Sequence, residues 1–297
     1  MSAVTSKNKK ITKAVIPAAG LGTRMLPISR AVPKEMLPIV DKPAISYLVE
    51  ECAASGIKDI LIITGRSKTM MEDYFDYSLE YEAKLKESGR EDEIPELRRI
   101  ADLCNIHYIR QLETKGLGHA ITFAHTFVGD DPFVVLYGDD IIFSEKPVVK
   151  QIIEAYEKYN LPTVGVKEVP VELVMKYDSL KVHQLEEKIY KVETMIEKPR
   201  IDQIYSHFSI LGRVLLTSEI FDILYDLPPG AGGEIQLTDA MKIMAETIGM
   251  IAVDFEGTRY DLGSKIGFLK VNTEQATKNP ELGSEFREYL KEFVKTL

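Results

Sequence analysis

The sequence is poor in several features that would point to particular classes of protein. It contains no tryptophan and two cysteines, Cys52 and Cys104, among its 297 residues. Neither cysteine belongs to a CxxC pair of the kind that binds metals, and two thiols do not make a disulfide framework. We therefore expect free thiols, buried in a protein of the reducing cytoplasm, and we exclude a disulfide-stabilised secreted scaffold.

Long hydrophobic runs and an excess of positive charge are also missing. No run approaches the ~18 apolar residues of a membrane-spanning helix, and no apolar segment follows the basic residues at the N-terminus as it would in a signal peptide. The 37 basic and 46 acidic residues give a formal net charge of -9. Because nucleic acids and anionic membranes require a basic surface, we expect the protein to bind neither.

The most informative segment that is present runs from Lys13 to Pro38. A short apolar run at 13–17 is followed by the small-residue turn 18–22, and then by Arg24 and Lys34. Glycine has no Cβ, so the backbone N–H groups of such a turn can approach a phosphate closely. The two cations can neutralise a polyphosphate. The segment therefore predicts a binding site for a nucleoside triphosphate.

Two better-known phosphate-binding loops do not fit this segment. The P-loop pattern is absent, and the dinucleotide fingerprint requires a third small residue where this chain has Arg24. A single Gly-x-Gly also fits an ordinary turn between a strand and a helix. Arg24 and the run PKEMLP at 33–38 are what favour the functional interpretation.

The apolar pattern predicts an α/β fold. A helix over 43–56 between strands at 13–17 and 60–64 forms a βαβ unit and implies a parallel sheet. Further strands are expected at 106–110, 133–137, 163–169, 179–182, 189–196, 210–216 and 251–255. Helices are expected at 80–87 and 91–99 in a charged insertion, in a segment continuing to 127, and at 147–159, 218–227, 234–247, 265–277 and 281–294, with a polar turn at 259–263.

LGTRMLP at 21–27 and PKEMLPIVDKP at 33–43 resemble the signature of the nucleotidyltransferases that make nucleoside-diphosphate sugars. Within that family, the segments are most similar to the bacterial UTP–glucose-1-phosphate uridylyltransferases, over about residues 13–290. The resemblance implies that a sugar 1-phosphate attacks the α-phosphorus of the nucleotide and that pyrophosphate leaves. Because a phosphate monoester with a second pKa near 6 is mostly dianionic at neutral pH, the nucleophile needs no general base. The site must instead align two polyanions and neutralise their charge.

The resemblance also implies roles for individual residues. Arg24 and Lys34 contact the triphosphate and the leaving pyrophosphate, and Lys198 in Glu-Lys-Pro contacts the sugar phosphate. Asp139 follows an expected buried strand, at the edge where ligands of an open α/β sheet gather. With Asp261 it is expected to hold Mg²⁺, which takes one or two carboxylates. Contacts to the nucleotide are implied for Ala19, Gly20, Gly22, Glu35, Gln111 and Gly116.

The sugar side departs from the family pattern. Glu197 is implied to accept hydrogen bonds from sugar hydroxyls, but Asp178 stands where most relatives have glycine and His207 stands where most have asparagine. Asp178 adds bulk and charge near a phosphorylated substrate, so the identity of the hexose stays open. Uracil and thymine share one pairing edge, so the choice between UTP and dTTP stays open as well. Asp140 could support the metal site or could be an ordinary turn or cap residue.

We therefore predict Mg²⁺-dependent formation of UDP-glucose and pyrophosphate from UTP and glucose 1-phosphate. The expected fold is one α/β domain over 13–297 on a mixed, mainly parallel sheet with Rossmann-like βαβ units. It would comprise a nucleotide-binding half (13–145), a sugar-binding half on the same sheet (146–264) and C-terminal helices (265–297) that close the core or form an interface, after a flexible tail (1–12). We also expect a homo-oligomer, a dimer or a tetramer.

Two alternatives belong to other functional classes. A non-catalytic paralogue that binds a sugar nucleotide would not need to retain both predicted metal carboxylates and all three cations. An NAD-dependent oxidoreductase would need a third glycine and an acidic residue after the second strand, where this chain has Thr64 and Gly65.

Overall fold

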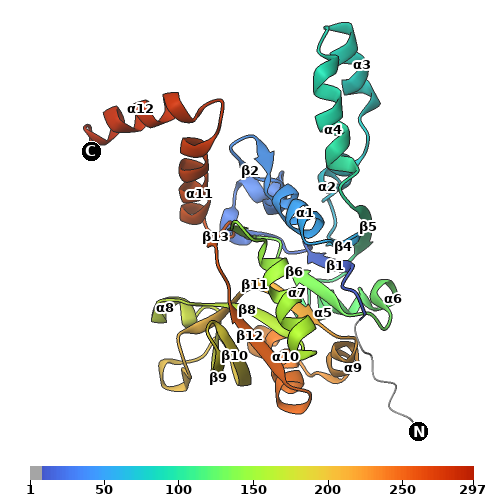
Figure 1. Cartoon of the computed structure of the whole chain (residues 1–297), viewed down its shortest axis with the longest axis vertical. Helices are drawn as coiled ribbons and strands as arrows, with labels where there is room; N and C mark the ends of the chain where they lie inside the picture. The colour runs from blue at the N-terminus through green and yellow to red at the C-terminus, as the bar shows by residue number, and fades with distance from the viewer. Residues whose placement is uncertain (1–8) are drawn as a thin grey trace.

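A computed structural model describes residues 9–297, and a nine-stranded sheet forms its centre (Figure 1). The strands lie in the order β5-β4-β1-β6-β11-β8-β12-β10-β9. Their bounds are β1 (Lys13–Pro17), β4 (Asp59–Thr64), β5 (Asn105–Arg110), β6 (Phe133–Leu136), β8 (Thr163–Glu168), β9 (Asp178–Glu186), β10 (Ile189–Glu197), β11 (Phe208–Leu216) and β12 (Met250–Asp254). Two short two-stranded sheets accompany it, β2 (Pro38–Ile39) with β3 (Lys42–Pro43) and β7 (Asp140–Phe143) with β13 (Thr258–Asp261).

The sheet is mixed, and its parallel pairs are concentrated in the N-terminal half of the chain. Strand β1 pairs in parallel with β4 and β6, and β4 pairs in parallel with β5. Strand β11 then pairs antiparallel with both β6 and β8, so it joins the two halves. Helix α1 (Ala44–Ala54) connects β1 to the parallel β4. The predicted α/β fold with a βαβ unit and one sheet through both halves is therefore confirmed.

Helices cover both faces of the sheet, which explains why central strands such as β4 and β6 are continuous apolar runs. Successive side chains of a strand point to opposite faces, so Ile62 belongs to one apolar core and its neighbour Ile63 to the other. The first core is packed by α1 and α7 (Val148–Tyr159). The second is packed by α5 (Leu117–Thr122), α9 (Glu219–Asp226) and α10 (Leu237–Thr247). Burial on both faces is typical of parallel sheets.

Two parts of the chain project from this body in Figure 1. The charged insertion forms α2 (Met70–Phe75), α3 (Leu79–Glu87) and α4 (Ile94–Ala101), of which α2 was not predicted. The C-terminal helices are α11 (Lys265–Lys278) and α12 (Gly283–Val294), and the remaining short helices are α6 (His125–Val128) and α8 (Val171–Val174). Single 3-10 turns occur at Thr23–Met25, Ile28–Arg30, Lys34–Met36, Glu91–Glu93, Ile201–Gln203 and Ala231–Gly233.

Three predictions of local structure need correction. The helix expected to continue to 127 is divided into α5 and α6. The segment expected as a polar turn at 259–263 begins as strand β13, because it pairs with β7, a strand that the apolar pattern did not indicate. Residues 1–8 of the expected flexible tail lie outside the described residues, whereas Ile11 is buried in the core and Lys9 forms an ion pair with Asp131.

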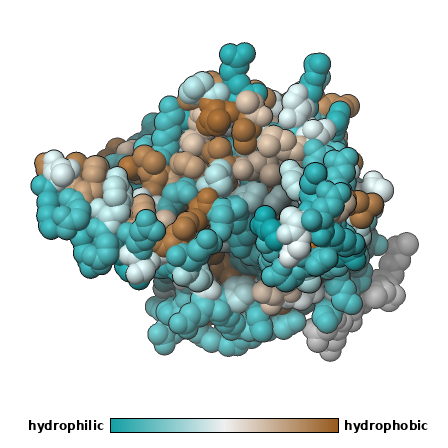
Figure 2. All heavy atoms as spheres, turned by 90° about the horizontal axis from the view of Figure 1, so that it is seen from above, coloured by the Kyte–Doolittle hydropathy of each residue, from teal (hydrophilic) through white to brown (hydrophobic). Residues whose placement is uncertain are grey.

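The described surface is predominantly polar on the face seen in Figure 2, where apolar residues gather in patches among hydrophilic ones. Over residues 9–297, no helix is both long enough and apolar enough to cross a lipid bilayer.

Candidate active site

A cavity of about 380 Å³ lies beyond the ends of β1 and β6. Because these strands are parallel neighbours, their carboxyl ends meet at one edge of the sheet, where open α/β sheets bind ligands. The cavity brings together segments that lie about a hundred residues apart in the sequence. Its lining includes these residues that the sequence analysis proposed: Ala19, Gly20, Gly22, Lys34, Glu35, Gln111, Gly116 and Asp139.

Two glycines of this cavity are required by the backbone. Gly22 has a φ of 65°, in the left-handed region that side chains other than glycine's disfavour. Gly116 has a φ of 106°, and a Cβ at this position would lie 2.5 Å from the carbonyl oxygen of Ile235. The chain therefore packs directly against the segment before α10 at this point, and Leu117 can begin helix α5 beside the cavity.

Cations and carboxylates meet at one end of the cavity. The Lys34 Nζ lies 2.6 Å from Asp139 Oδ2, and Arg24 lies 3.7 Å from both Asp139 and Asp261. Burial opposes the ionisation of Asp139, but the attraction of Lys34 outweighs it and lowers the pKa of Asp139. The Arg24 side chain is 63% exposed, so it can turn toward a bound anion.

The two carboxylates fit a divalent cation. A Cβ on Gly263 would meet the Arg24 guanidinium and would lie 2.7 Å from Asp139 Oδ2 and 2.9 Å from Asp261 Oδ1, so the two carboxylates and Arg24 converge beside this glycine. Within residues 9–297, no group of three or more His, Cys, Asp or Glu side chains could hold a metal ion. Mg²⁺ does not require such a group, because it takes one or two protein carboxylates and completes its shell with phosphate and water.

The sequence analysis missed a hydrogen-bond network that connects Asp140 to Asp261 through Arg259 and Tyr177. Arg259 donates from Nε to Asp140 Oδ1 at 2.7 Å and from Nη1 to the Tyr177 hydroxyl at 2.9 Å. That hydroxyl in turn donates to Asp261 Oδ2 at 3.3 Å. Burial raises the pKa of Asp140 to about 6 against the opposing effect of Arg259. Asp140 thus supports the site through Arg259. In the sequence, Arg259 stands two residues before Asp261 and was interpreted as part of a polar turn, so its role in this network was not predicted.

The residues predicted for the sugar side lie at the end of strand β10, with Glu197 as its last residue and Lys198 directly after it. Lys198 has a φ of 44° and its N–H donates to the Tyr177 carbonyl at 2.8 Å. Left-handed backbone at a non-glycine residue is unfavourable and is common at functional sites. The Lys198 side chain is half exposed, with Nζ 3.4 Å from Glu197 Oε1, and burial raises the pKa of Glu197. Tyr177 therefore contacts Lys198 through its backbone and Asp261 through its side chain.

The two residues that depart from the family pattern, Asp178 and His207, differ in burial. Asp178 is buried, and its Oδ1 accepts a hydrogen bond from the Ile210 N–H at 2.9 Å. Burial raises the pKa of Asp178 well above its usual range, and the neighbouring Glu197 adds to this effect. His207 is exposed, and its carbonyl accepts from the Val169 N–H. Asp178 is therefore turned toward strand β11, and neither residue lines the cavity described above.

The Gln111 side chain is fixed by two neighbours. Its Nε2 lies 2.9 Å from His119 Nδ1 and 3.4 Å from the Gly116 carbonyl oxygen. Burial lowers the pKa of His119, so the neutral ring can accept this hydrogen bond through Nδ1. His119, which the sequence analysis did not propose as a site residue, thus orients the Gln111 amide.

Glu35 lies at the back of the cavity and is fully buried. Its Oε2 accepts from Lys68 Nζ at 3.0 Å, whereas Oε1 has no hydrogen-bond partner among the described residues. Burial raises the pKa of Glu35 in spite of the nearby Lys68 and Lys34. Lys68 was not predicted as a site residue, because the sequence around it indicated only a charged surface insertion.

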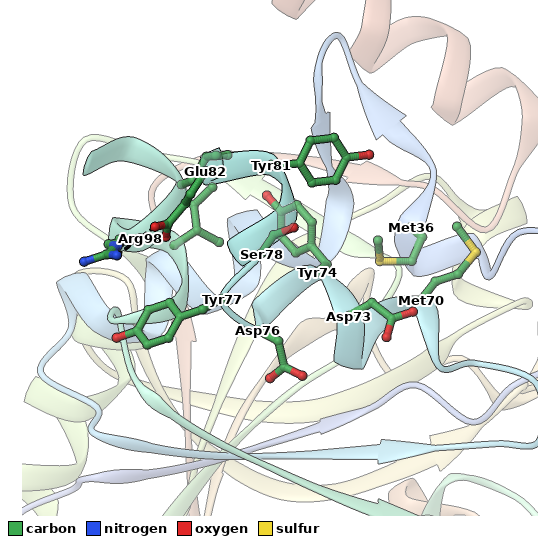
Figure 3. A pocket seen from close by; sticks show the side chains of 12 residues that line it. Met36, Met70, Asp73, Tyr74, Asp76, Tyr77, Ser78, Tyr81, Glu82 and Arg98 are labelled. Atoms are coloured by element: carbon green, nitrogen blue, oxygen red, sulfur yellow. Dashed lines mark hydrogen bonds and ion pairs between the residues drawn. The ribbon is translucent and has the colours of Figure 1, made fainter. Parts of the chain in front are cut away.

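A second hollow lies between the insertion helices and the segment after Glu35 (Figure 3). Figure 3 shows Met36 and Met70 at one end and the Glu82–Arg98 ion pair at the other. Three tyrosines contribute to its lining, Tyr74, Tyr77 and Tyr81. The hollow contains none of the predicted phosphate-binding or metal-binding residues, so the chemistry is assigned to the cavity at the sheet edge.

Comparisons with known proteins identify the family of the chain. The model of the family described as nucleotidyl transferase matches residues 13–278. A Bacillus subtilis protein named UTP–glucose-1-phosphate uridylyltransferase YngB is 50% identical over 287 residues, 97% of each chain.

Solved structures are similar as well. A UDP-glucose pyrophosphorylase complexed with UDP-glucose has 42% identity and a TM-score of 0.83, covering 91% of this chain and 100% of that one. A UTP-bound enzyme of Acinetobacter baumannii has 35% identity and a TM-score of 0.88, covering 95% of this chain and 99% of that one.

Proposed function

The chain belongs to the nucleotidyl transferase family, and on this premise we propose that it forms UDP-glucose and pyrophosphate from UTP and glucose 1-phosphate. The relatives named above carry that activity in their names or hold UTP or UDP-glucose. The observation that carries the proposal is the cavity itself. It brings the glycine-rich turn, Lys34, Gln111 and Asp139 into one space at the edge of the sheet.

The proposed reaction needs charge neutralisation and alignment more than proton transfer. An oxygen of the sugar phosphate attacks the α-phosphorus of UTP, the bond to the bridging oxygen breaks, and pyrophosphate leaves. Arg24 and Lys34 contact the triphosphate and the departing pyrophosphate, and Lys198 holds the sugar phosphate. Asp139 and Asp261 would hold Mg²⁺, which supplies further charge neutralisation when bound.

The geometry of Gln111 supports recognition of uracil. Its Nε2 is occupied by His119 and the Gly116 carbonyl, so Oε1 is the acceptor that the amide can offer to a ligand. An acceptor matches the N3–H of uracil and does not match N3 of cytosine, which is itself an acceptor. Thymine presents the same edge, so dTTP is the runner-up nucleotide. We place the base between Gln111, Gly116 and the backbone of Ala19 and Gly20.

The sugar side supports a hexose 1-phosphate, with Glu197 accepting from its hydroxyls. We propose glucose, and another hexose is the runner-up. Asp178 and His207 stay candidate determinants of this choice. The buried Asp178 carboxyl accepts a hydrogen bond from the Ile210 N–H. We therefore expect Asp178 to influence the sugar site mainly by positioning strand β11, and less by its negative charge. A cytoplasmic location stays a prediction from the sequence.

We also propose a homo-oligomer, a dimer or a tetramer, in which α12 contributes to the interface. Helix α12 packs on α11, and Gly283 is its one buried residue among those described. Its exposed side chains include Tyr289 and Phe293, whose rings stack at 5.9 Å. Helix α12 thus leaves an apolar face available for an interface, whereas α11 helps to close the first core through the buried Val271.

Pyrophosphate release tests the proposed function directly. We would assay the purified protein with Mg²⁺ and UTP, dTTP, ATP, CTP or GTP, each paired with the 1-phosphates of glucose, galactose and N-acetylglucosamine. We expect the fastest turnover with UTP and glucose 1-phosphate. Turnover with only another sugar 1-phosphate would support the proposed reaction type and would replace glucose 1-phosphate as the proposed substrate. UTP binding without turnover for every pair would support the non-catalytic paralogue and reject the proposal.

A further inference from the structure

The ammonium group of Lys68 lies behind the glycine-rich turn and is almost completely buried. Lys68 follows β4 and is 8% exposed. Its Nζ donates to the carbonyl oxygens of Ala18 and Gly20, the latter at 2.8 Å, and to Glu35 Oε2 at 3.0 Å. An ammonium has three protons, so each of its donors is used. Buried lysines are rare unless they are paired, and burial lowers the pKa of Lys68 although Glu35 opposes this effect.

These contacts determine which way the backbone of the turn faces. In a trans peptide the N–H of one residue points opposite to the carbonyl of the residue before it, and the peptides of this turn are not cis. With the Ala18 and Gly20 carbonyls directed at Lys68, the N–H groups of Ala19 and Leu21 point away from it. Neither N–H has an acceptor among the described residues, and both residues line the cavity. The turn therefore presents free N–H donors on its ligand side.

Lys68 also joins two segments that the proposed function assigns to the nucleotide. The turn at 18–22 and the segment containing Lys34 and Glu35 are separated by short 3-10 turns, which provide little rigidity. A single ammonium contacts both of them. Because its three donors already have partners, Lys68 has none left for a ligand.

We propose that Lys68 is a positioning residue, which holds the glycine-rich turn and Glu35 in the arrangement that receives the uridine nucleotide without contacting the nucleotide itself. The proposal rests on the proposed function. Loss of the ammonium would release both carbonyls and leave the Glu35 carboxyl buried without its partner. The affinity for the nucleotide should therefore fall more than the affinity for the sugar phosphate, which is proposed to bind at Lys198.

Lys68→Met tests this role, with Lys13→Met as the matched control. Lys13 lies at the opposite end of β1, and its Nζ donates to the carbonyls of Phe127 and Val128 and pairs with Asp131 at 2.9 Å. The control thus removes the same kind of contacts, two carbonyls and a carboxylate, away from the cavity. For each protein we would measure the Kd for UTP by calorimetry, KM for both substrates, kcat and Tm.

We expect Lys68→Met to raise Kd and KM for UTP by about tenfold or more, the size expected for hydrogen bonds to a charged group. KM for glucose 1-phosphate should change less than threefold in this variant. Lys13→Met should lower Tm and leave UTP binding unchanged. Equal effects of the two substitutions on UTP binding, or an unchanged Kd in Lys68→Met, would overturn the positioning role.

If Lys68→Met does not fold, Lys68→Gln decides the question. The shorter glutamine side chain can donate hydrogen bonds but cannot reach all three acceptors or neutralise Glu35. A folded Gln variant with weaker UTP binding supports the proposal, and one with wild-type UTP binding rejects it. The wild-type protein separates the two proposals: if it binds and turns over UTP while Lys68→Met is unchanged, the positioning role fails and the proposed function stands.

Discussion

At the residue scale, Asp139 is the carboxylate with the most ion pairs in the predicted site. It pairs with Lys34 and Arg24 and faces the same space as Asp261. The proposed function therefore requires the Asp139 charge for turnover, while the base is proposed to contact Gln111 and Gly116.

We predict that Asp139→Asn loses turnover by a factor of about 10²–10³, as for the loss of one electrostatic contact to a transition state, and largely keeps UTP binding. Pyrophosphate release and calorimetric titration with UTP would measure the two effects. Asp131→Asn is the control, because Asp131 pairs with Lys9 and Lys13 at the other end of the sheet. Unchanged turnover in Asp139→Asn would reject the metal assignment.

Asp178 shows how burial changes the meaning of an unusual residue. From the sequence it was an added charge beside a phosphorylated substrate. In the structure its carboxyl is buried in strand β9 across from Glu197, and its pKa is raised by burial. A carboxyl whose folded-state pKa is raised binds its proton more tightly when folded. It costs no stability below its unfolded pKa of about 3.9, and its cost grows as pH rises above that value.

We therefore predict that Asp178→Asn stabilises the protein at pH 8, by about 2–4 °C in Tm, and that the gain disappears as pH falls toward 4. Asparagine keeps an acceptor for the Ile210 N–H and removes the ionisation. Asp202→Asn is the control, because Arg200 lowers the pKa of the exposed Asp202 and no gain at pH 8 is expected. A Tm difference that is independent of pH would contradict the assigned cause.

At the scale of elements, α12 stands out because it contributes no residue to either apolar core. Its apolar residues do not reach either core, and its three aromatic side chains form a stacked row, Phe286, Tyr289 and Phe293. Ion pairs between positions three apart on α12 involve exposed groups and contribute little stability. The exposed aromatic row of α12 is therefore better explained by packing against a second copy of the chain than by packing within the monomer.

We predict that deleting residues 284–297 lowers the oligomeric mass measured by light scattering and changes Tm of the remaining chain by less than about 2 °C. The double substitution Glu288→Ala/Lys291→Ala is the control, since it removes an exposed ion pair and keeps the aromatic row. If the deleted protein keeps its oligomeric mass, α12 is not part of the interface.

At the scale of the whole molecule, one buried ion pair ties the two halves together. Arg213 of β11 is fully buried, and its guanidinium pairs with Glu51 of α1 at 2.6 Å and donates to the Asp140 carbonyl at 2.9 Å. Strand β11 is also the strand that joins the parallel half of the sheet to the rest. The nucleotide half and the sugar half should therefore unfold together.

We predict a single calorimetric transition for the wild-type protein and a loss of about 3–5 kcal/mol in the free energy of unfolding for Arg213→Met. Removing one partner of a buried pair leaves the other charge uncompensated, which is why the cost is large. Arg200→Met, which breaks the exposed pair with Asp202, should cost less than about 1 kcal/mol. Two separate transitions in the wild-type protein would contradict one cooperative domain.

The sequence by itself determined the features that depend on neighbouring residues. The apolar runs and helical spacings located every strand of the central sheet and most helices. The βαβ unit predicted the parallel pairing of β1 with β4, and the motif around Arg24 and Lys34 indicated nucleotide chemistry before any contact was known. These signals are local, because they arise from backbone propensity, side-chain periodicity and glycine conformations over a few residues.

The tertiary structure alone decided the features that depend on long-range contacts. Strands β7 and β13 exist because they pair with each other across more than a hundred residues. Lys68, Arg259 and Tyr177 looked like ordinary polar residues in sequence, and their buried partners lie 33 to 119 positions away. Whether a charged side chain is solvated or holds an active site depends on burial and on partners from other segments. Only the packed chain brings these together.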